Sequence, residues 1–390
     1  MQQILHINDL PVLAKIFNPS GEHLFILTSS TKKHTIPDTL GCDCYFFSNA
    51  TTLLKRLESL PAQTGTVINL SNQAIKLPIL KTEQFVFINL VKPSKHSSNY
   101  KTWQFNYINN SDDTIRWIYN AHSQKPIFLN LYNAAGWRGA IFKTGIQLAF
   151  LFRLQSALKN GRFWVSARDL TIENIAFQLQ DAQYAIFTGT TGENRKAVIS
   201  FEEQGKATQF LKMPLTKQAK TLVETEKTAL QQLAKLALEK LVIPKEKTIG
   251  ANLMVSNVRP TKADHTNTLG TIHLLALHEL YESTARTIPF IQIEVWKEIQ
   301  HNLFLLKSTP IVNDLPNSKI VHLSNLLDNL LAQFSPLQTI SVAMAHGDFT
   351  PWNTYTTKHK VYVYDWELAE ELPLLYDCLL YTSPSPRDRG

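Results

Sequence analysis

The spacing of apolar residues changes at about residue 182, and this change limits which folds the chain can adopt. Before it, short apolar runs rich in β-branched and aromatic residues surround a segment with helical spacing. That segment, residues 49–60, carries four leucines on one face. The predicted strands are residues 23–29, 65–71 and 84–91. Strands interleaved with a helix predict a small α/β domain with parallel strands over residues 1–165.

After residue 182 the sequence predicts three strands joined by tight turns, and then a long charged helix. The helix, residues 219–241, carries an apolar stripe of leucines. A further strand and two helices are predicted at residues 252–258, 271–283 and 321–334. A β-rich part over 182–260 followed by a mostly helical part over 261–377 is an α+β layout.

Residues 140–163 are predicted to form a helix that is apolar nearly all round. Its basic residues are Lys143, Arg153, Lys159 and Arg162. One interpretation is an interfacial helix that makes peripheral membrane contact through residues 140–158. The other is a buried helix that joins two domains, because its apolar core is too short to span a bilayer. We favour burial, since a broad apolar face fits burial at least as well as insertion.

The composition limits the classes of function. The chain has 390 residues, of which 44% are hydrophobic and 18% charged, as in soluble globular proteins. Its net charge of +7 is spread without a basic run, so no nucleic-acid partner is expected. No apolar run reaches the ~18 residues of a membrane span. The first residues lack the pattern of a signal peptide, and three cysteines are too few for a zinc site. We therefore expect a cytoplasmic protein.

The last stretch, "CLLYTSPSPRDRG" (378–390), is predicted not to be native. Its reverse translation closely resembles a transposase-based sequencing adapter read in frame. The first adapter base also leaves codon 377 open between Asp and Glu. The alternative is a disordered Ser/Pro tail. We favour the adapter, and with it a helical part that is truncated at its C-terminus.

Transfer of a γ-phosphoryl group needs four components, and the chain offers a candidate for each. They are a backbone cradle for phosphates, a cation, oxygen ligands for a divalent metal, and a carboxylate that faces the acceptor hydroxyl. The cradle candidate is the first turn after residue 182, because glycine lets backbone N–H groups approach phosphate oxygens. Its residues are Gly189, Thr190, Thr191 and Gly192. An ordinary hairpin turn favours glycine as well.

The cation candidate is Lys212 in the predicted strand "TQFLKMPL". A strand would point its side chain to the face opposite to those of Leu211 and Met213. A carboxylate on the following helix should hold the ammonium group, and Glu226 fits best, with Glu224 second. The other interpretation of both glutamates is a solvated helix face.

The stretches "AHGDFTPWN" and "YVYDWE" supply the remaining components. Asp348 would accept the proton of the acceptor hydroxyl. Asn353 and Asp365 would offer hard oxygens to Mg²⁺, which takes few protein ligands besides phosphates and waters. The alternating run before Asp365 predicts a strand that ends at this carboxylate. His346 is expected to organise the loop through hydrogen bonds rather than to act as a base.

The pattern His-Gly-Asp, four residues and Asn, followed by "YVYDWE", resembles the aminoglycoside phosphotransferase and choline kinase-like family. The resemblance covers about residues 182–377. It implies a bilobal, protein kinase-like fold and a kinase that moves the γ-phosphoryl of ATP or GTP, with Mg²⁺, to a small-molecule hydroxyl. By the same resemblance, Asp348 is the catalytic aspartate and Asn353 and Asp365 are the metal ligands. The remaining matches are nucleotide-binding: Lys212, Glu226, and a hinge strand around Ser256 to Val258.

The resemblance leaves the acceptor and the activity open. No Gly follows Asp365 and no Arg lies in the catalytic-loop motif, so the activation segment of protein kinases is not expected. We expect a sugar or envelope-polysaccharide precursor as the acceptor, with an aminoglycoside or choline-like compound as the alternative. The rival function is a catalytically silent kinase-like module that binds nucleotide or regulates a partner.

Overall fold

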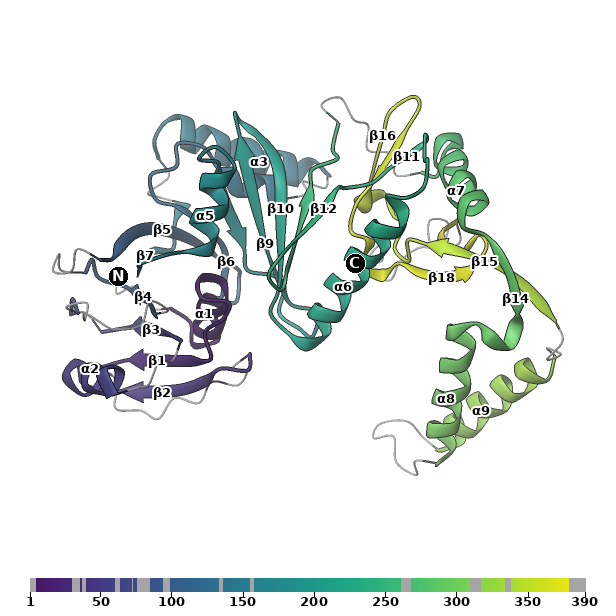
Figure 1. Cartoon of the computed structure of the whole chain (residues 1–390), viewed down its shortest axis with the longest axis horizontal. Helices are drawn as coiled ribbons and strands as arrows, with labels where there is room; N and C mark the ends of the chain where they lie inside the picture. The colour runs from purple at the N-terminus through teal and green to yellow at the C-terminus, as the bar shows by residue number, and fades with distance from the viewer. Residues whose placement is uncertain are drawn as a thin grey trace. The chain divides into compact units, whose positions relative to one another are not determined.

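The computed structural model divides into two compact units of mixed α and β structure (Figure 1). Unit 1 comprises Met1–Val223 and Glu246–Asn257, and unit 2 comprises Glu224–Lys245 and Val258–Gly390. The described residues are 5–29, 36, 40–59, 64–71, 73–75, 85–93, 99–132, 136–154, 158–260, 268–308, 317–333 and 338–378. Apart from Cys378, the tail predicted to be adapter-derived lies outside them.

A large mixed sheet forms the frame of unit 1. Within the described residues its order is β12-β13-β10-β9-β8-β6-β5-β7-β4-β3-β1-β2. The bounds are β1 (His23–Leu27), β2 (Asp43–Phe47), β3 (Gly65–Asn69), β4 (Phe85–Asn89), β5 (Lys101–Asn109), β6 (Ile115–Asn120), β7 (Gly161–Ala167), β8 (Gln183–Phe187), β9 (Lys196–Glu203), β10 (Lys206–Pro214), β12 (Glu246–Ile249) and β13 (Asn252–Ser256). The predicted domain over 1–165 and the predicted β-rich part over 182–260 thus both contribute strands to one sheet.

The sheet is parallel at one edge and antiparallel elsewhere. Strands β2, β1, β3 and β4 pair in parallel, which confirms the predicted parallel strands of the N-terminal part. The other neighbours are antiparallel, from the β4–β7 pair to the β12–β13 pair. Strands β8, β9 and β10 follow one another as hairpins, as predicted for the chain after residue 182. This antiparallel part carries Lys212 and the turn that begins at Gly189.

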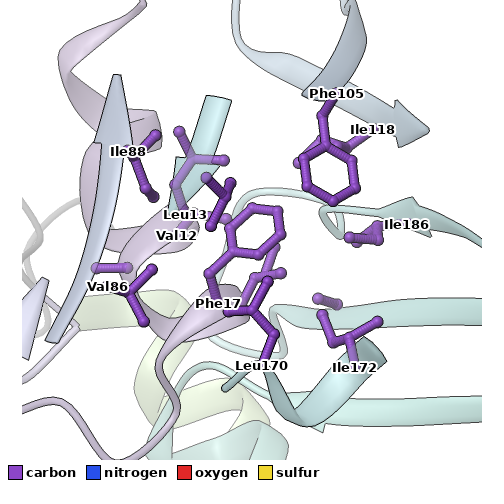
Figure 2. Close-up of a cluster of buried hydrophobic side chains, with 14 of the residues drawn as sticks. Val12, Leu13, Phe17, Val86, Ile88, Phe105, Ile118, Leu170, Ile172 and Ile186 are labelled. Carbon is purple, nitrogen blue, oxygen red and sulfur yellow. The ribbon is translucent and has the colours of Figure 1, made fainter. Parts of the chain in front are cut away.

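Successive residues of a strand point to opposite sides of the sheet. Both faces of this sheet therefore present apolar side chains, and helices pack on each. One face packs against α1 (Leu10–Phe17) and α5 (Thr171–Gln178). Figure 2 shows part of this cluster, in which Phe17 of α1 and Ile172 of α5 lie near side chains of the sheet such as Phe105 and Ile186. The other face packs against α2 (Ala50–Ser59), η2 (Ile127–Leu131) and α3 (Gly136–Leu151).

Helix α3 ends earlier than the predicted helix over 140–163. The N–H of Leu154 donates to the carbonyl of Ala149 at 2.7 Å, and Arg153 adopts a left-handed conformation with φ 58°. This is the pattern of a Schellman motif. It forms here without the glycine that usually marks a helix end in a sequence. Strand β7 then begins inside the segment that was predicted to be helical, so that part of the prediction is wrong.

The favoured burial of this helix is also wrong for one of its faces. Ile146 and Phe150 are only 6% and 4% exposed, because they pack on the aromatic cluster of β6 and η2. Trp137 and Leu151, in contrast, are 69% and 73% exposed. Among the described residues, no helix is long and apolar enough to cross a membrane. An exposed apolar face on α3 therefore remains to be explained.

Asp9 is a buried carboxylate whose protonation links the stability of unit 1 to pH. Both carboxylate oxygens accept the N–H of Ile115, each at 3.1 Å, and the residue is 1% exposed. Burial raises the pKa of Asp9 to about 6, against the opposing effects of the Ile115 N–H and the charge of Arg195. The folded state therefore binds this proton more tightly than the unfolded chain, whose Asp pKa is about 3.9.

We expect Asp9→Asn to flatten the pH dependence of stability between pH 4 and pH 7. In the unsubstituted protein the contribution of Asp9 is fully present below about pH 4 and is lost as the pH rises through about 6. The loss is on the order of 2–3 kcal/mol, at about 1.4 kcal/mol per pKa unit. The carboxamide of the variant keeps an acceptor for the N–H of Ile115 but does not ionise. Urea denaturation from pH 4.0 to 7.5 measures the difference, and parallel stability curves would contradict the assignment.

Unit 2 combines two small sheets with helices. Among its described residues the sheet orders are β11-β17-β16 and β14-β15-β18. Helix α6 begins in unit 1 and continues into unit 2. The bounds are α6 (Lys217–Leu233), β11 (Leu241–Val242), α7 (Thr271–Thr284), β14 (Arg286–Pro289), η3 (Phe290–Gln292), α8 (Glu294–Ser308), α9 (Asn317–Ala332), β15 (Thr339–Ala345), η4 (Pro351–Asn353), β16 (Thr354–Thr356), β17 (Val361–Val363), η5 (Trp366–Leu368) and β18 (Glu370–Pro373).

Helix α6 is shorter at its C-terminal end than the predicted helix over 219–241. Glu279 on α7 accepts the backbone N–H groups of Glu239, Lys240 and Leu241 at 2.6, 2.8 and 3.0 Å. In a continuing helix, those N–H groups would instead donate to the backbone carbonyls four residues earlier. Glu279, about forty residues away in the sequence, therefore holds the extended backbone that leads into β11. The residues next to the end of α6 do not indicate this contact.

Candidate active site

The candidate catalytic residues lie on the loop between β15 and β16 and on the loop after β17, all within unit 2. Strands β16 and β17 form an antiparallel hairpin in which Thr354 pairs with Val363. The backbone bond from Tyr364 N–H to the Asn353 carbonyl, at 3.2 Å, continues this ladder. The hairpin therefore brings the end of the first loop beside Asp365, as a strand ending at this aspartate would require.

Asn353 holds the carboxylate of Asp348 in place. Its Nδ2 donates to Asp348 Oδ2 at 2.9 Å and to the Asp348 carbonyl at 3.0 Å. Asn353 is buried, whereas Asp348 is half-buried. Because the amide nitrogen is used in this way, the carboxamide oxygen is the atom of Asn353 that remains for a cation. The five-residue spacing thus yields one oriented carboxylate and one amide oxygen.

His346 organises the loop, as expected. Its Nδ1 accepts the N–H of Asp348 at 3.2 Å, and its Nε2 lies 3.0 Å from the Tyr364 carbonyl. A ring that accepts at Nδ1 carries its proton at Nε2, so Nε2 donates to Tyr364. The ring is fully buried and packs edge-on against Trp366 at 4.7 Å between centroids. One side chain therefore ties the Asp348 loop to the strand that carries Asp365.

Asp365 has a strained backbone. Its φ of 68° and ψ of 56° place it in the left-handed region, directly after β17 and before η5. This region costs a residue other than glycine roughly 1–2 kcal/mol, although Asp and Asn tolerate it better than most residues. Such strain recurs at functional sites, where the surrounding structure holds it. The observation supports a special role for Asp365 beyond loop chemistry.

Asp377 is a contributor that the sequence analysis did not identify. It is fully buried, and its two carboxylate oxygens accept the N–H groups of His346 at 2.7 Å and Gly347 at 3.0 Å. Burial raises the pKa of Asp377, while the two backbone N–H bonds act in the opposite direction. A carboxylate some thirty residues downstream therefore clasps the backbone of the candidate catalytic loop. Nothing in the sequence near residue 377, which directly precedes the segment predicted to be adapter-derived, indicates this contact.

Gly347 is required by close packing as well as by its conformation. It has φ 81°, and a Cβ added there would lie 2.1 Å from the carbonyl oxygen of Leu368. The candidate catalytic loop thus packs directly on the backbone of the segment that follows Asp365. The motif contains this glycine, but the sequence analysis assigned it no role.

We expect Gly347→Ala to destabilise the protein by about 3 kcal/mol, from left-handed strain and from the clash together. The matched control is Gly250→Ala, which has φ 60° and open space where the Cβ would go. It should cost only the conformational part, about 1 kcal/mol. Urea denaturation of both variants checks the difference. Equal losses for the two variants would show that the packing on Leu368 does not constrain position 347.

The candidate nucleotide residues of unit 1 lie where the sequence predicted them. Gly189 follows β8 with φ 81°, and a Cβ there would lie 2.3 Å from the Lys196 carbonyl oxygen. Gly192 has φ 144° and open space around it, and Thr190 and Thr191 between them are exposed. This turn therefore needs one glycine for close packing and leaves its tip to solvent.

Lys212 and Ser256 lie on the antiparallel part of the same sheet. Lys212 is 8% exposed on β10, opposite Val198 of β9 and Leu253 of β13. Ser256 ends β13 and is half-buried. In unit 2, Glu226 on α6 is fully buried, which rules out the solvated helix face for this residue. Val258 begins the second segment of that unit.

The donor set in unit 2 suits a magnesium ion that is shared with phosphates. Among the described residues, no group of three or more His, Cys, Asp or Glu could hold a metal ion by itself. Asp365 and the amide oxygen of Asn353 offer two hard oxygen ligands. Mg²⁺ characteristically takes one or two carboxylates together with substrate phosphates and waters. The residues present therefore fit a metal that arrives with a nucleotide.

Comparisons with known proteins place the chain near two groups of solved structures. No family model matches the sequence, and no curated protein matches it. The streptomycin–ATP complex of the aminoglycoside phosphotransferase APH(2″)-IIa is 14% identical with a TM-score of 0.37, over 53% of this chain and 73% of that one. The ADP-bound APH(2″)-Ib is 15% identical with a TM-score of 0.40, over 54% and 74%. The choline kinase LicA from Streptococcus pneumoniae is 16% identical with a TM-score of 0.36, over 56% and 76%.

Proposed function

We propose that the chain is a small-molecule phosphotransferase that moves the γ-phosphoryl group of ATP or GTP to a hydroxyl group. The observation that carries the proposal is the arrangement around Asn353. The side-chain Nδ2 of Asn353 donates to the carboxylate of Asp348 at 2.9 Å. Asn353 also directly precedes the β16–β17 hairpin, whose second strand leads to the strained Asp365. Asp348 is thus proposed as the general base, and Asn353 and Asp365 as the two oxygen ligands that phosphoryl transfer uses, within one unit and beside one hairpin.

Asp348 is the proposed catalytic residue. Its half-buried carboxylate accepts the proton of the acceptor hydroxyl as the oxygen turns toward the γ-phosphorus. The hydrogen bond from Asn353 holds the orientation of that carboxylate, and the bonds made by His346 and Asp377 hold the backbone of the loop. Positioning of this kind supplies much of the rate in phosphoryl transfer, because there is little covalent chemistry for the protein to do.

The metal and nucleotide residues have distinct proposed roles. Asp365 and Asn353 would hold Mg²⁺, which neutralises charge on the phosphates when it is bound. In unit 1, Lys212 and the turn formed by Gly189, Thr190, Thr191 and Gly192 are proposed to contact the phosphates. Glu226 is proposed to be a further nucleotide-binding residue, and the backbone from Ser256 to Val258 is proposed to contact the adenine.

We further propose a bilobal domain, with 182–260 as the β-rich lobe and 261–377 as the helical lobe, preceded by a domain over 1–165. The antiparallel order β8-β9-β10-β13-β12 and the helical content of unit 2 support this division. A cytoplasmic location is proposed on the ground that Cys42 and Cys44 form no disulfide. A sugar or envelope-polysaccharide precursor is the proposed acceptor. Membrane contact through 140–158 is a separate proposal, because it concerns unit 1 alone.

The test is nucleotide turnover against a panel of acceptors. The protein is incubated with Mg²⁺ and ATP or GTP, together with amino sugars, aminoglycosides, choline and sugar precursors, and phosphorylated product is detected by mass spectrometry. We expect product with one acceptor class and none when Mg²⁺ is chelated. Tight nucleotide binding without turnover on any acceptor would favour the silent, regulatory module instead.

A further inference from the structure

The exposed side of helix α3 is an apolar stripe that runs along the whole helix. Residues on an α-helix are spaced by about 100°, so positions three, four and seven apart share a face. By this spacing the exposed stripe lies opposite the two buried anchors, Ile146 and Phe150. Its members are Trp137 (69% exposed), Ile141 (62%), Leu148 (46%) and Leu151 (73%). The stripe is therefore the face turned away from the sheet.

The stripe continues beyond the end of the helix. Phe152 and Leu154, in the turn after α3, are 66% and 57% exposed. Phe142 borders the stripe at 40% exposed, with its ring 5.2 Å from that of Tyr132. Contiguous apolar surface of this extent, on the order of several hundred Å², is uncommon on soluble proteins without a partner. Burial in the core cannot account for it, because the core side of the helix is already filled.

The segment of sequence that contains the stripe carries charges of one sign, and an acidic residue outside it, Glu202 of β9, lies 4.0 Å from Lys125. Residues 114–168 contain no Asp or Glu and carry eight basic residues: Arg116, Lys125, Arg138, Lys143, Arg153, Lys159, Arg162 and Arg168. Arg153 is exposed at the end of the helix, and Lys143 and Lys159 are half-buried. The pKa of Lys159 is lowered, first by burial and then by the charge of Arg162, which shows that basic groups crowd together there. Such a surface attracts anions and repels basic partners.

We propose that α3 docks unit 1 on an anionic lipid surface, with the apolar stripe in the interface and the basic residues against lipid headgroups. One face of α3 is already packed on the sheet, so only its exposed apolar face would enter the interface, and the helix would lie in the interface plane without crossing the bilayer. Trp137 at the start of the stripe is the residue type that prefers the headgroup level. The inference does not depend on the proposed phosphotransferase activity.

The test is co-sedimentation with vesicles, in the absence of nucleotide. Vesicles of phosphatidylcholine with phosphatidylglycerol are compared with vesicles of phosphatidylcholine alone. The protein should bind the anionic vesicles at least tenfold more tightly, and the preference should fall in high salt. The double variant Ile141→Ser with Leu148→Ser should bind them about tenfold more weakly, because two inserted side chains are lost.

Two further variants separate the apolar and the electrostatic contributions. Arg153→Asn removes a charge and introduces a residue type that tolerates the left-handed φ of 58°. It should weaken binding to anionic vesicles about fivefold and leave binding to neutral vesicles unchanged. Phe177→Ser is the matched control, since Phe177 is 74% exposed on α5, which packs on the other face of the sheet. It should bind as the unsubstituted protein does.

Several outcomes would overturn the proposal. They are failure of the unsubstituted protein to bind anionic vesicles, equal binding by the double variant, and equal weakening by Phe177→Ser. A dimer that the double variant dissociates in sedimentation equilibrium, with vesicle binding unchanged, would also overturn it and would assign the stripe to a second copy of the chain. Thermal unfolding of each variant, expected to match that of the unsubstituted protein, verifies that the fold is intact.

Discussion

Asp348→Asn should reduce turnover by at least ~10³-fold while leaving nucleotide affinity within a few-fold of the unsubstituted protein. The substitution keeps the size of the side chain, and the oxygen of the new carboxamide can still accept the amide of Asn353 that now donates to Asp348 at 2.9 Å. It removes the negative charge that would draw the proton from the acceptor hydroxyl. The loss should therefore appear in kcat rather than in nucleotide binding.

The measurement combines steady-state turnover on the identified acceptor with nucleotide binding by fluorescence titration. Glu282→Gln is the matched control, because it removes a carboxylate from an exposed position of α7 in the same unit. It should leave both quantities unchanged. Turnover of Asp348→Asn near the rate of the unsubstituted protein would refute the base assignment, whatever its nucleotide affinity.

Asp365→Gly should weaken Mg²⁺-dependent nucleotide binding by ~100-fold or more and lower turnover with it. A direct carboxylate ligand should matter at least as much as groups that contact a metal only through another ligand, whose loss typically costs 10–100-fold. Glycine is the informative choice because Asp365 has φ 68° and ψ 56°. Glycine adopts this conformation without strain, so the variant should be no less stable than the unsubstituted protein.

The control for this prediction is Asp113→Gly. Asp113 also has a positive φ, of 64°, and lies exposed on the β5–β6 connection in unit 1. Its replacement should change stability in the same direction and leave metal-dependent nucleotide binding untouched. Binding is measured by titration of a fluorescent nucleotide with and without Mg²⁺, and stability by urea denaturation. Unchanged Mg²⁺-dependent binding in Asp365→Gly would remove this residue from the proposed metal site.

Several strands and helices could be predicted from local pattern, but two helix ends could not, and neither could the central strands β5, β6 and β7. The parallel strands near the N-terminus and the hairpins after residue 182 follow from runs that alternate or stay apolar over a few residues. The end of α3 is a local Schellman turn that lacks the glycine by which such turns are usually recognised. The extended backbone that follows α6 is held by a carboxylate of α7, about forty residues away in the sequence.

The candidate site divides in the same way. Asp348 and Asn353 were recognisable because their spacing is short enough for one loop to bring them together, as the 2.9 Å bond between them shows. Asp377 gave no signal, because its role exists only once its carboxylate reaches two N–H groups some thirty residues upstream. The need for glycine at position 347 likewise arises from the backbone of Leu368.

The sequence by itself therefore determined the type of those elements with a clear apolar pattern and the residue types at the centre of the candidate site, since these depend on periodicity and on spacing within a loop. It did not identify the central strands β5, β6 and β7 or the helices α1, α5 and α8. The tertiary structure decided the path of the chain after α6, which face of α3 stays exposed, and which groups brace the candidate catalytic loop. These features depend on contacts between residues far apart in the chain. Apolar periodicity indicates that a helix will bury a face, but only the packed sheet shows that Ile146 and Phe150 fill that role while Trp137 and Leu151 remain exposed.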